Sequence, residues 1–285
     1  MMSKIIDGKA VSAAVKDAAK REVASLKEKG ISVGLAVILV GQDPASKIYV
    51  ANKKKTCESL GIVSSEYILP EDTTQDELIE LIKTLNNESS VNGILCQLPL
   101  PRHIDESAVI AAISPNKDVD AFHEINVGKI MIGDYDFVPC TPAGIMEMLK
   151  YYDIDPCGKN CVVIGRSNIV GKPMAMLLLH KNGTVTVCHS KTQNLGEITS
   201  KADILVAAVG RAKFVTCDMV KEGAVVIDVG MNRTPEGLFG DVDFQSVSPK
   251  CSYITPVPGG VGPMTIAMLM KNTVTAAKRQ NGIEN

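Results

Sequence analysis

Apolar and polar residues follow two different periods along the first hundred residues. A continuous apolar run at 33–40 is typical of a strand buried on both faces, as in parallel sheets, and 91–98 predicts another apolar strand. Before residue 33, apolar residues recur at helical spacing and Gly30 is a stop signal. The segments 45–60 and 75–85 also have a composition or spacing that favours helix. Strands that alternate with helices predict a parallel α/β sheet. The predicted elements are helix 1–30, strand 33–40, helix 45–60, strand 67–69, helix 75–85 and strand 91–98.

The second half repeats this alternation after an irregular segment. Residues 116–142 lose periodicity and carry Pro, Gly and Asp, as a segment between two domains does. The elements predicted after it are helix 144–152, strand 160–164, helix 172–181, strands 184–188, 204–209 and 224–229, and a closing helix 265–278. A chain of 285 residues also favours two domains. We therefore expect an α/β fold with two domains that flank a cleft.

Composition narrows the class of protein. The chain is 45% hydrophobic with a formal net charge of −2, and it has no Trp, so nucleic-acid binding is disfavoured. Eight cysteines without a C-x-x-C pair, and four histidines without a cluster, predict buried core cysteines and no metal site. The first eight residues lack the apolar core of a secretory signal. A reduced cytoplasmic protein is the simplest interpretation.

One uncharged stretch is long enough to span a bilayer. Residues 251–270 carry no charged side chain, but Pro256, Pro258 and Pro263 interrupt them together with several glycines. No continuous helix tolerates that sequence, so we predict a rigid turn followed by a helix. The helix after Pro263 is expected to return to the first domain, and the turn is expected to lie at the cleft.

A glycine-bearing turn joins the predicted strand 160–164 to the next helix. Such a turn lets backbone N–H groups and a helix N-terminus meet a pyrophosphate. The match to G-x-G-x-x-G is incomplete because Ser167 takes the second glycine position, and an ordinary tight turn is the alternative. The next strand ends in residues 188–192 without the acid that selects NAD. Its absence favours NADP, whose 2′-phosphate Arg166 can pair with and Ser190 can donate to.

Three polar residues of the first half are candidates for chemistry. Tyr49 and Lys53 stand four apart on a predicted helix, so they share one face and can supply an aromatic surface and a proton-transfer group. The alternative is that residues 53–55 form a solvated basic stretch. Gln97 ends an apolar strand, where α/β sheets hold their ligands, although a satisfied buried amide is an equal alternative.

Two acids begin the irregular segment. Asp118 and Asp120 can cap a helix or tie a turn, which is the usual role of Asp in loops. At the mouth of a cleft, such an acid can instead accept N–H bonds from a heterocycle with an amidine-like edge. The residues alone leave both interpretations open.

Taken together, these segments resemble the bifunctional methylenetetrahydrofolate dehydrogenase/methenyltetrahydrofolate cyclohydrolases over essentially the whole chain. Where that family usually shows glycine and proline, this chain has Ala121 and Glu124. The segments that carry the resemblance are Asp43–Ser46 leading to Tyr49 and Lys53, Gln97–Pro101, Asp118–Asp120, Gly165–Ser167 and Pro256–Thr265.

The resemblance implies two successive reactions. NADP takes a hydride from 5,10-methylenetetrahydrofolate, and water then opens the methenyl cation to 10-formyltetrahydrofolate. Lys53 looks like the acid and base of hydration and ring opening, with a lowered pKa in a partly dry cleft. Gln97 looks like the partner that orients this lysine, Tyr49 like the ring that packs along the folate, and Asp120 like the anchor of the pterin.

The resemblance also implies domains and partners. Residues 1–139 and 264–285 would form the folate-binding catalytic domain, and 140–263 a Rossmann-like NADP-binding domain with a mostly parallel sheet. Pro258 and Gly259 would contact the substrate at the cleft. A homodimer formed through the nucleotide domain is the family expectation. The residues that match the family's NADP contacts are Gly165, Arg166, Ser167, Ser190 and Met231.

Three alternatives remain at this point. A shikimate-dehydrogenase-like NADP oxidoreductase would explain the glycine turn but not Tyr49, Lys53 and Gln97. A monofunctional dehydrogenase of the same family would be expected to lack the lysine. A nucleotide-binding sensor or scaffold without turnover would not need intact candidate catalytic residues.

Overall fold

The computed structural model describes residues 3–283, and for residues 44–46 and 48 it describes the backbone alone. Two compact units make up the chain. The six-stranded unit comprises the described residues up to 13 together with 139–267, and the three-stranded unit comprises 14–138 and those from 268 onward. Two of the three boundaries fall inside helices α1 (Gly8–Glu28) and α10 (Gly262–Gln280), and the third lies just before residue 139.

This division differs from the expected one near the N-terminus. The expected boundaries assign residues 1–139 to one domain, but residues 3–13 belong to the six-stranded unit. The reason is strand β1 (Lys4–Ile5), which pairs in parallel with β11 (Tyr253–Ile254). The backbone N–H of Ile6 extends this pairing by donating to the carbonyl of Ile254 at 2.9 Å. A two-residue strand has no periodicity, so the sequence pattern did not reveal it.

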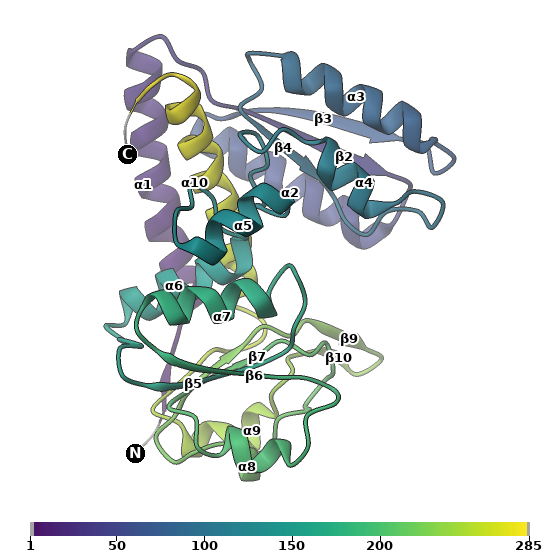
Figure 1. Cartoon of the computed structure of the whole chain (residues 1–285). Helices are drawn as coiled ribbons and strands as arrows, with labels where there is room; N and C mark the ends of the chain where they lie inside the picture. Colours follow the sequence, from purple (N-terminus) through teal and green to yellow (C-terminus); the bar gives the residue numbers. More distant parts are fainter. Residues whose placement is uncertain (1–2, 284–285) are drawn as a thin grey trace. The chain divides into compact units, whose positions relative to one another are not determined.

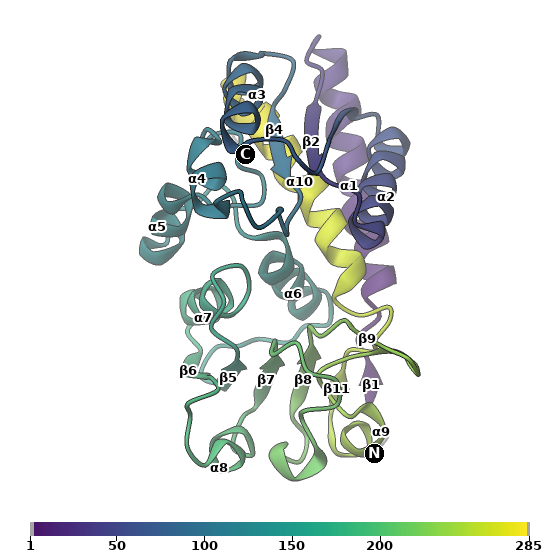
Figure 2. The ribbon, with the colours of Figure 1, turned by 90° about the vertical axis from the view of Figure 1, so that its right-hand side faces the viewer.

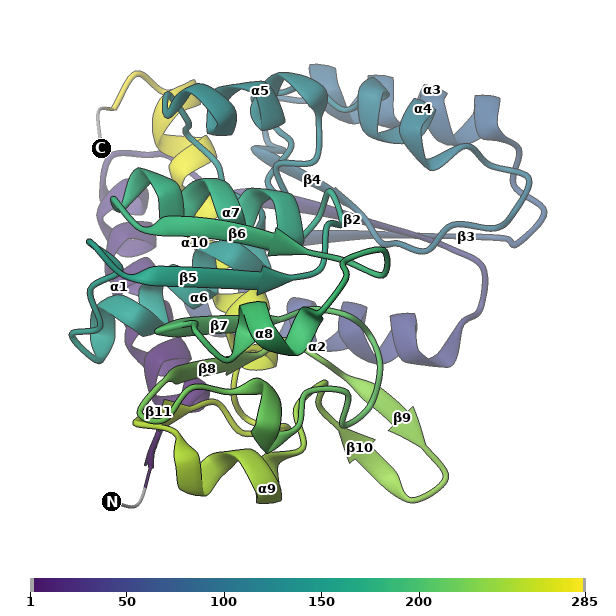
Figure 3. The same ribbon diagram turned by 60° about the horizontal axis from the view of Figure 1, so that its bottom comes forward.

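The three-stranded unit holds a parallel sheet in the order β3-β2-β4. Figures 2 and 3 show helices α2 and α3 on opposite faces of this sheet, which explains why every residue of β2 is buried. Leu78, Ile82 and Leu85 of α3 pack against β2 and β4. The elements are β2 (Gly34–Val40), α2 (Pro44–Leu60), β3 (Val63–Leu69), α3 (Gln75–Asn87), β4 (Gly93–Cys96), α4 (Glu106–Ala112) and α5 (Glu124–Ile132).

Helix α5 corrects the expectation of an irregular segment at 116–142. It begins at the N-cap His123, whose Nδ1 accepts the N–H of Ile125 at 3.1 Å, and it ends at Gly133 in the left-handed conformation. Ile125, Met131 and Ile132 are exposed in it, so its apolar residues do not form the inward stripe that reveals a helix.

The six-stranded unit has a parallel sheet in the order β1-β11-β8-β7-β5-β6. Helices α6 and α7 cover one face and α8 and α9 the other (Figure 1). A short antiparallel hairpin, β9 and β10, follows β8. The elements are α6 (Cys140–Tyr151), β5 (Asn160–Ile164), α7 (Gly171–His180), β6 (Thr184–Cys188), α8 (Leu195–Thr199), β7 (Ile204–Ala207), β8 (Val225–Asp228), β9 (Asn232–Thr234), β10 (Gly237–Phe239) and α9 (Phe244–Val247). Two 3₁₀ turns, Cys217–Met219 and Ser248–Lys250, complete the unit.

The predicted α/β class with mostly parallel sheets is confirmed. The uncharged stretch 251–270 contains β11, a turn and the start of α10, as the prolines predict. Among the helices of residues 3–283, none combines the length and apolar character needed to cross a membrane. All eight cysteines are free, but Cys157 and Cys217 are exposed, so the expectation of core cysteines is wrong for these two.

Candidate active site and cofactor site

Gln97 lies at the point of the three-stranded unit where the strand order reverses. The chain passes from β2 to β3 on one side and later to β4 on the other. Gln97 directly follows β4, and its backbone N–H donates to the carbonyl of Ile38 in β2 at 2.8 Å. The side chain therefore starts between the carboxyl ends of two neighbouring parallel strands, which is the usual ligand position in α/β sheets.

Lys53 projects from the buried face of α2. Val50, Cys57 and Leu60 recur with it at helical spacing and are buried, and Lys53 itself is only 7% exposed. Its neighbours Lys54 and Lys55 are exposed. The interpretation of residues 53–55 as one solvated basic stretch is therefore wrong for Lys53.

The amino group of Lys53 is hydrogen-bonded to Gln97. Lys53 Nζ donates to Gln97 Oε1 at 2.6 Å, and Gln97 Nε2 donates to the carbonyl of Leu98 at 2.7 Å. The second bond orients the amide so that its oxygen faces the lysine. This pair of hydrogen bonds fixes the position of the Lys53 amino group.

The other two candidates of this unit are Tyr49 and Asp120. Tyr49 is one helical turn before Lys53 and is 38% exposed, which leaves its ring accessible. Asp118 forms an isolated parallel bridge with Ile94 of β4, and Asp120 lies in the turn that follows it. Asp120 is half-buried.

Asp118 has a structural role. It is 3% exposed and accepts hydrogen bonds from the His123 N–H at 2.8 Å and the Asn126 Nδ2 at 2.9 Å. Burial raises the pKa of its carboxyl group, although these hydrogen bonds oppose the effect. Of the two interpretations of this acidic pair, tying the turn applies to Asp118.

The glycine turn lies at the corresponding point of the six-stranded unit. The chain moves from β5 to β6 on one side and to β7 on the other, so the carboxyl ends of β5 and β7 bracket the turn. Gly165 has φ +132°, and a Cβ there would lie 2.3 Å from the carbonyl oxygen of Ala208, just after β7. A Cβ on Gly171 would lie 2.2 Å from the carbonyl oxygen of Gly165. Only glycine fits at either position.

This cradle suits a pyrophosphate. Backbone groups line the turn, and it runs into the N-terminus of α7, where free N–H groups and the helix dipole favour an anion. Ser167 keeps the turn closed, because its Oγ accepts the N–H groups of Val170 and Gly171 at 3.2 and 3.3 Å. The residues present therefore fit a dinucleotide, even though the fingerprint was incomplete.

Arg166 and Ser190 extend from the ends of adjacent strands. The N–H of Gly165 donates to the carbonyl of Cys188 at 2.9 Å, which joins the end of β5 to the end of β6. Arg166 and Ser190 follow these two residues closely, and both are exposed. Met231, after β8, is 49% exposed.

Pro258 and Gly259 belong to the same unit as the glycine turn. They follow β11, and Gly259 has φ +104°. A Cβ on Gly8 would lie 1.7 Å from the carbonyl oxygen of Gly260, so the start of α1 packs directly on the turn 256–263. Thus the structure brings Lys53 and Gln97 into contact. Tyr49 and Asp120 belong to the same three-stranded unit as this pair. Pro258, Gly259 and all the predicted cofactor residues belong to the six-stranded unit.

Sequence reasoning missed two buried carboxylates at the cofactor edge. Asp228 ends β8 and Asp241 follows the hairpin, and they are 3% and 0% exposed. Burial raises the pKa of Asp228 to about 6, against the opposing hydrogen bonds from backbone N–H groups. The available signal was an acid at the end of an apolar strand followed by glycine, at 228–230.

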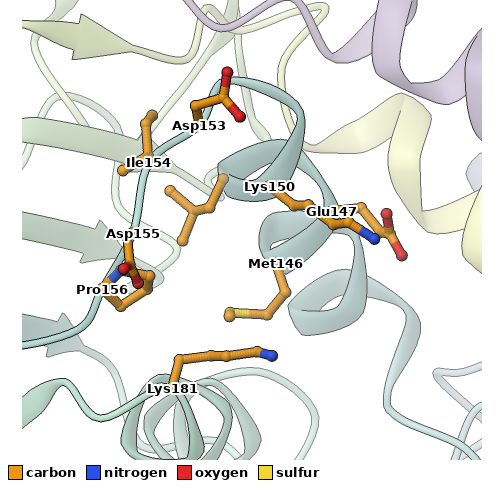
Figure 4. A pocket seen from close by; sticks show the side chains of 9 residues that line it. Met146, Glu147, Lys150, Asp153, Ile154, Asp155, Pro156 and Lys181 are labelled. Carbon is orange, nitrogen blue, oxygen red and sulfur yellow. The ribbon is translucent and has the colours of Figure 1, made fainter.

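Two hollows lie in the six-stranded unit. The larger, of about 560 Å³, is shown in Figure 4, with Met146 of α6 facing Lys181 after α7. Residues 153–156 and Lys181 precede β5 and β6, so this hollow lies at the amino edge of the sheet and contains none of the predicted residues. The smaller, of about 290 Å³, lies at the carboxyl edge beside Asp228, Pro256 and Val257. Residues 3–283 contain no group of three or more His, Cys, Asp or Glu placed to hold a metal ion.

Two family models match this chain. The tetrahydrofolate dehydrogenase/cyclohydrolase catalytic domain matches residues 6–120, and the NAD(P)-binding domain of the same family matches residues 139–281. The chain belongs to the tetrahydrofolate dehydrogenase/cyclohydrolase family. The resemblance found in the sequence is confirmed, and a shikimate-dehydrogenase-like identity is wrong.

Similar proteins agree with this membership of the tetrahydrofolate dehydrogenase/cyclohydrolase family. The bifunctional protein FolD of Acetivibrio thermocellus is 63% identical over 98% of this chain and 99% of its own length. The FolD structure from Campylobacter jejuni has a TM-score of 0.95 at 54% identity, covering 97% of this chain and 99% of that one. The Trypanosoma brucei enzyme, solved with NADP and an inhibitor, has a TM-score of 0.93 at 40% identity, covering 98% of each chain. Thermus thermophilus shikimate dehydrogenase, at 17% identity over 86% of this chain and 99% of that one with a TM-score of 0.54, shares the fold alone.

Proposed function

We propose that Lys53 and Gln97 form the acid–base pair of a bifunctional folate enzyme. The enzyme oxidises 5,10-methylenetetrahydrofolate to the methenyl cation with NADP and hydrolyses that cation to 10-formyltetrahydrofolate. The observation that carries the proposal is the hydrogen bond between a buried lysine and a glutamine at a strand reversal. A buried amino group fixed by a hydrogen bond is suited to exchange a proton.

The oxidation requires positioning rather than proton transfer. Bound NADP supplies the hydride acceptor. The turn from Gly165 to Gly171 and the N-terminus of α7 would hold the pyrophosphate, with Ser167 closing the turn. Arg166 and Ser190 would bind the 2′-phosphate, because they extend from adjacent strand ends without an acid between them. Met231 would lie near the nicotinamide ribose.

Four residues are proposed to contact the folate substrate. Asp120 would accept hydrogen bonds from the pterin, and Tyr49 would pack its exposed ring along the folate. Pro258 and Gly259 would contact the same substrate. These assignments are supported by the match of each residue to the family's motifs, and for Pro258 and Gly259 by their position after β11.

The hydrolysis requires proton transfer at two atoms. Lys53 would take a proton from water as the water oxygen bonds to the cationic one-carbon centre. It would then supply a proton to the ring nitrogen as the bond between that carbon and N5 breaks. As that bond breaks, the second proton of the added water leaves its oxygen for solvent and the formyl C=O forms. Each turnover therefore consumes one water and releases one proton, and Lys53 returns to its starting state. Gln97 would keep Nζ aimed at these atoms throughout.

We also propose a homodimer and a cytoplasmic location. Strand β6 lies at the end of the six-stranded sheet, and Val187 on it and Leu179 on α7 are 39% and 50% exposed. A second copy that covered this edge would bury both side chains. Free cysteines, two of them exposed, suit a reducing compartment.

A spectrophotometric assay tests the proposed function. Purified enzyme with 5,10-methylenetetrahydrofolate should produce NADPH from NADP faster than NADH from NAD. When the methenyl compound is supplied alone, the enzyme should hydrolyse this compound without NADP. Oxidation without hydrolysis would contradict the role of Lys53, and a preference for NAD would contradict the roles of Arg166 and Ser190.

A further inference from the structure

A buried carboxylate organises the loop that follows β7. Asp241 is fully buried, and its two oxygens accept the backbone N–H groups of three consecutive residues. The distances are 2.6 Å from Val209, 3.0 Å from Gly210 and 2.9 Å from Arg211. Asn232 Nδ2 adds a fourth hydrogen bond at 2.8 Å. Consecutive N–H groups aimed at one point form an anion-binding nest, and here the chain's own carboxylate occupies it.

A second carboxylate fixes the first. Asp228 accepts the N–H of Asp241 at 2.8 Å and those of Val242 and Gly230 at 2.9 Å each. The backbone packs closely on the pair at two glycines: a Cβ on Gly240 would lie 1.8 Å from Asp228 Oδ2, and one on Gly230 would lie 2.4 Å from Asp241 Oδ1. The segment after the hairpin is therefore held firmly against the end of β8.

The loop held by Asp241 adjoins the glycine turn. Ala208, immediately before the loop, has its carbonyl oxygen 2.3 Å from where a Cβ of Gly165 would lie. The N–H of Ala208 donates to the carbonyl of Ile164 at 2.8 Å. A displacement of residues 209–211 would therefore be transmitted to the turn that is proposed to hold the pyrophosphate.

We propose that Asp241 is a positioning residue for the NADP site. Its carboxylate fills the nest of residues 209–211, which keeps these N–H groups from competing for cofactor phosphate and holds the loop beside Gly165. The inference rests on the proposed placement of NADP at this sheet edge. It predicts that loss of the carboxylate weakens NADP binding while hydrolysis by Lys53, in the other unit, continues.

The test compares Asp241→Asn with Asp243→Asn. The N–H groups of residues 209–211 and the Asn232 side chain donate to both carboxylate oxygens of Asp241. Asparagine has only one acceptor oxygen, so the loop loses hydrogen bonds. Asp243 lies on the same segment and makes no side-chain cap to α9, which makes it a matched control. By calorimetric titration with NADP alone, we expect the dissociation constant to rise about tenfold in Asp241→Asn and to stay within twofold in the control. Hydrolysis of the methenyl compound without NADP should stay within twofold in both.

Equal NADP affinity in the two variants would overturn the proposal. A parallel loss of hydrolysis in Asp241→Asn would also overturn it, because the substitution would then disrupt the whole fold. Arg166→Ala separates this inference from the proposed function: if that variant binds NADP normally, the cofactor placement fails. If Arg166→Ala weakens binding but Asp241→Asn does not, only the role of Asp241 fails.

Hydrogen exchange on the unmodified enzyme gives a second measurement. Without NADP, the amides of residues 209–211 should exchange at least about a hundredfold more slowly than unprotected amides, because Asp241 accepts all three. Exchange at the unprotected rate would overturn the proposal even if the Asp241→Asn protein did not fold.

Discussion

The two units present their functional residues in opposite ways. In the three-stranded unit, the candidate proton-transfer group is a side chain, Lys53, buried on the core face of a helix and held by Gln97. In the six-stranded unit, the candidate cofactor site is built from backbone, and the side chains around it, such as Arg166 and Met231, are exposed. Two buried carboxylates of that unit, Asp228 and Asp241, accept hydrogen bonds from the backbone of neighbouring loops.

This contrast follows from the chemistry. A proton transfer depends on one group at one position, so a single side chain must be fixed and shielded from water. Recognition of a dinucleotide is shared among many contacts, several of them backbone N–H groups that substitution cannot remove. We therefore expect nearly complete loss of one reaction from a change at Lys53 and graded effects on affinity from changes around the glycine turn.

The largest effect is expected from Lys53→Met. Methionine keeps most of the side-chain volume but cannot transfer a proton, so hydrolysis of the methenyl compound should fall by about a thousandfold. The NADP dissociation constant should not change. Lys54→Met is the matched control, because Lys54 is exposed on the same helix, and we expect it to hydrolyse normally. Equal rates of methenyl hydrolysis in the two variants would contradict the assignment of proton transfer to the buried lysine.

The next effect concerns stability in the six-stranded unit. The pKa of Asp228 is raised to about 6 in the folded chain, from an ordinary value of 3.8. The folded state therefore holds this proton more tightly between these two pH values. The group's contribution to stability is fully present below pH 3.8 and is lost as pH rises through about 6, on the order of 3 kcal/mol in the free energy of unfolding.

Asp228→Asn checks this pH dependence. Urea denaturation between pH 4 and 7 should show a smaller loss of stability with rising pH in this variant than in the unmodified enzyme. Asp243→Asn should keep the original dependence, because that residue is not part of the carboxylate pair. If the free energy of unfolding depended on pH in the same way in Asp228→Asn and in the unmodified enzyme, the carboxyl group of Asp228 would not be the source of this pH dependence.

The smallest effect is expected from Arg166→Ala. An exposed arginine on a phosphate contributes a charge-assisted hydrogen bond, so the KM for NADP should rise about tenfold. The KM for the folate substrate should change less than twofold. The preference for NADP over NAD should fall in parallel, since only NADP carries the 2′-phosphate. Equal changes in both KM values would place Arg166 outside the cofactor site.

Most of the fold could be predicted because strongly apolar strands have a clear signature. The bounds of β5 and β6 match the prediction at both ends, and β2 matches within one residue. The elements that were missed are short or exposed. Strands β9 and β10 have three residues each and no buried residue, and α4 has seven residues with Val109 as its buried member.

The candidate site was predictable in its residues but not in its geometry. The spacing of Tyr49 and Lys53 placed them on one face, yet only the structure shows that Lys53 is buried and bonded to Gln97, 44 residues away. Asp241 could not be found from sequence, because its donors in residues 209–211 come from a different strand end. Long-range hydrogen bonds of this kind leave no periodic pattern.

The rate of methenyl hydrolysis in the absence of NADP, compared between Lys53→Met and Arg166→Ala, tests the division between the units most directly. We expect almost no hydrolysis in Lys53→Met and a rate within twofold of the unmodified enzyme in Arg166→Ala. If Arg166→Ala lost hydrolysis as fully as Lys53→Met, or if Lys53→Met kept it, proton transfer would not belong to the buried lysine of the three-stranded unit.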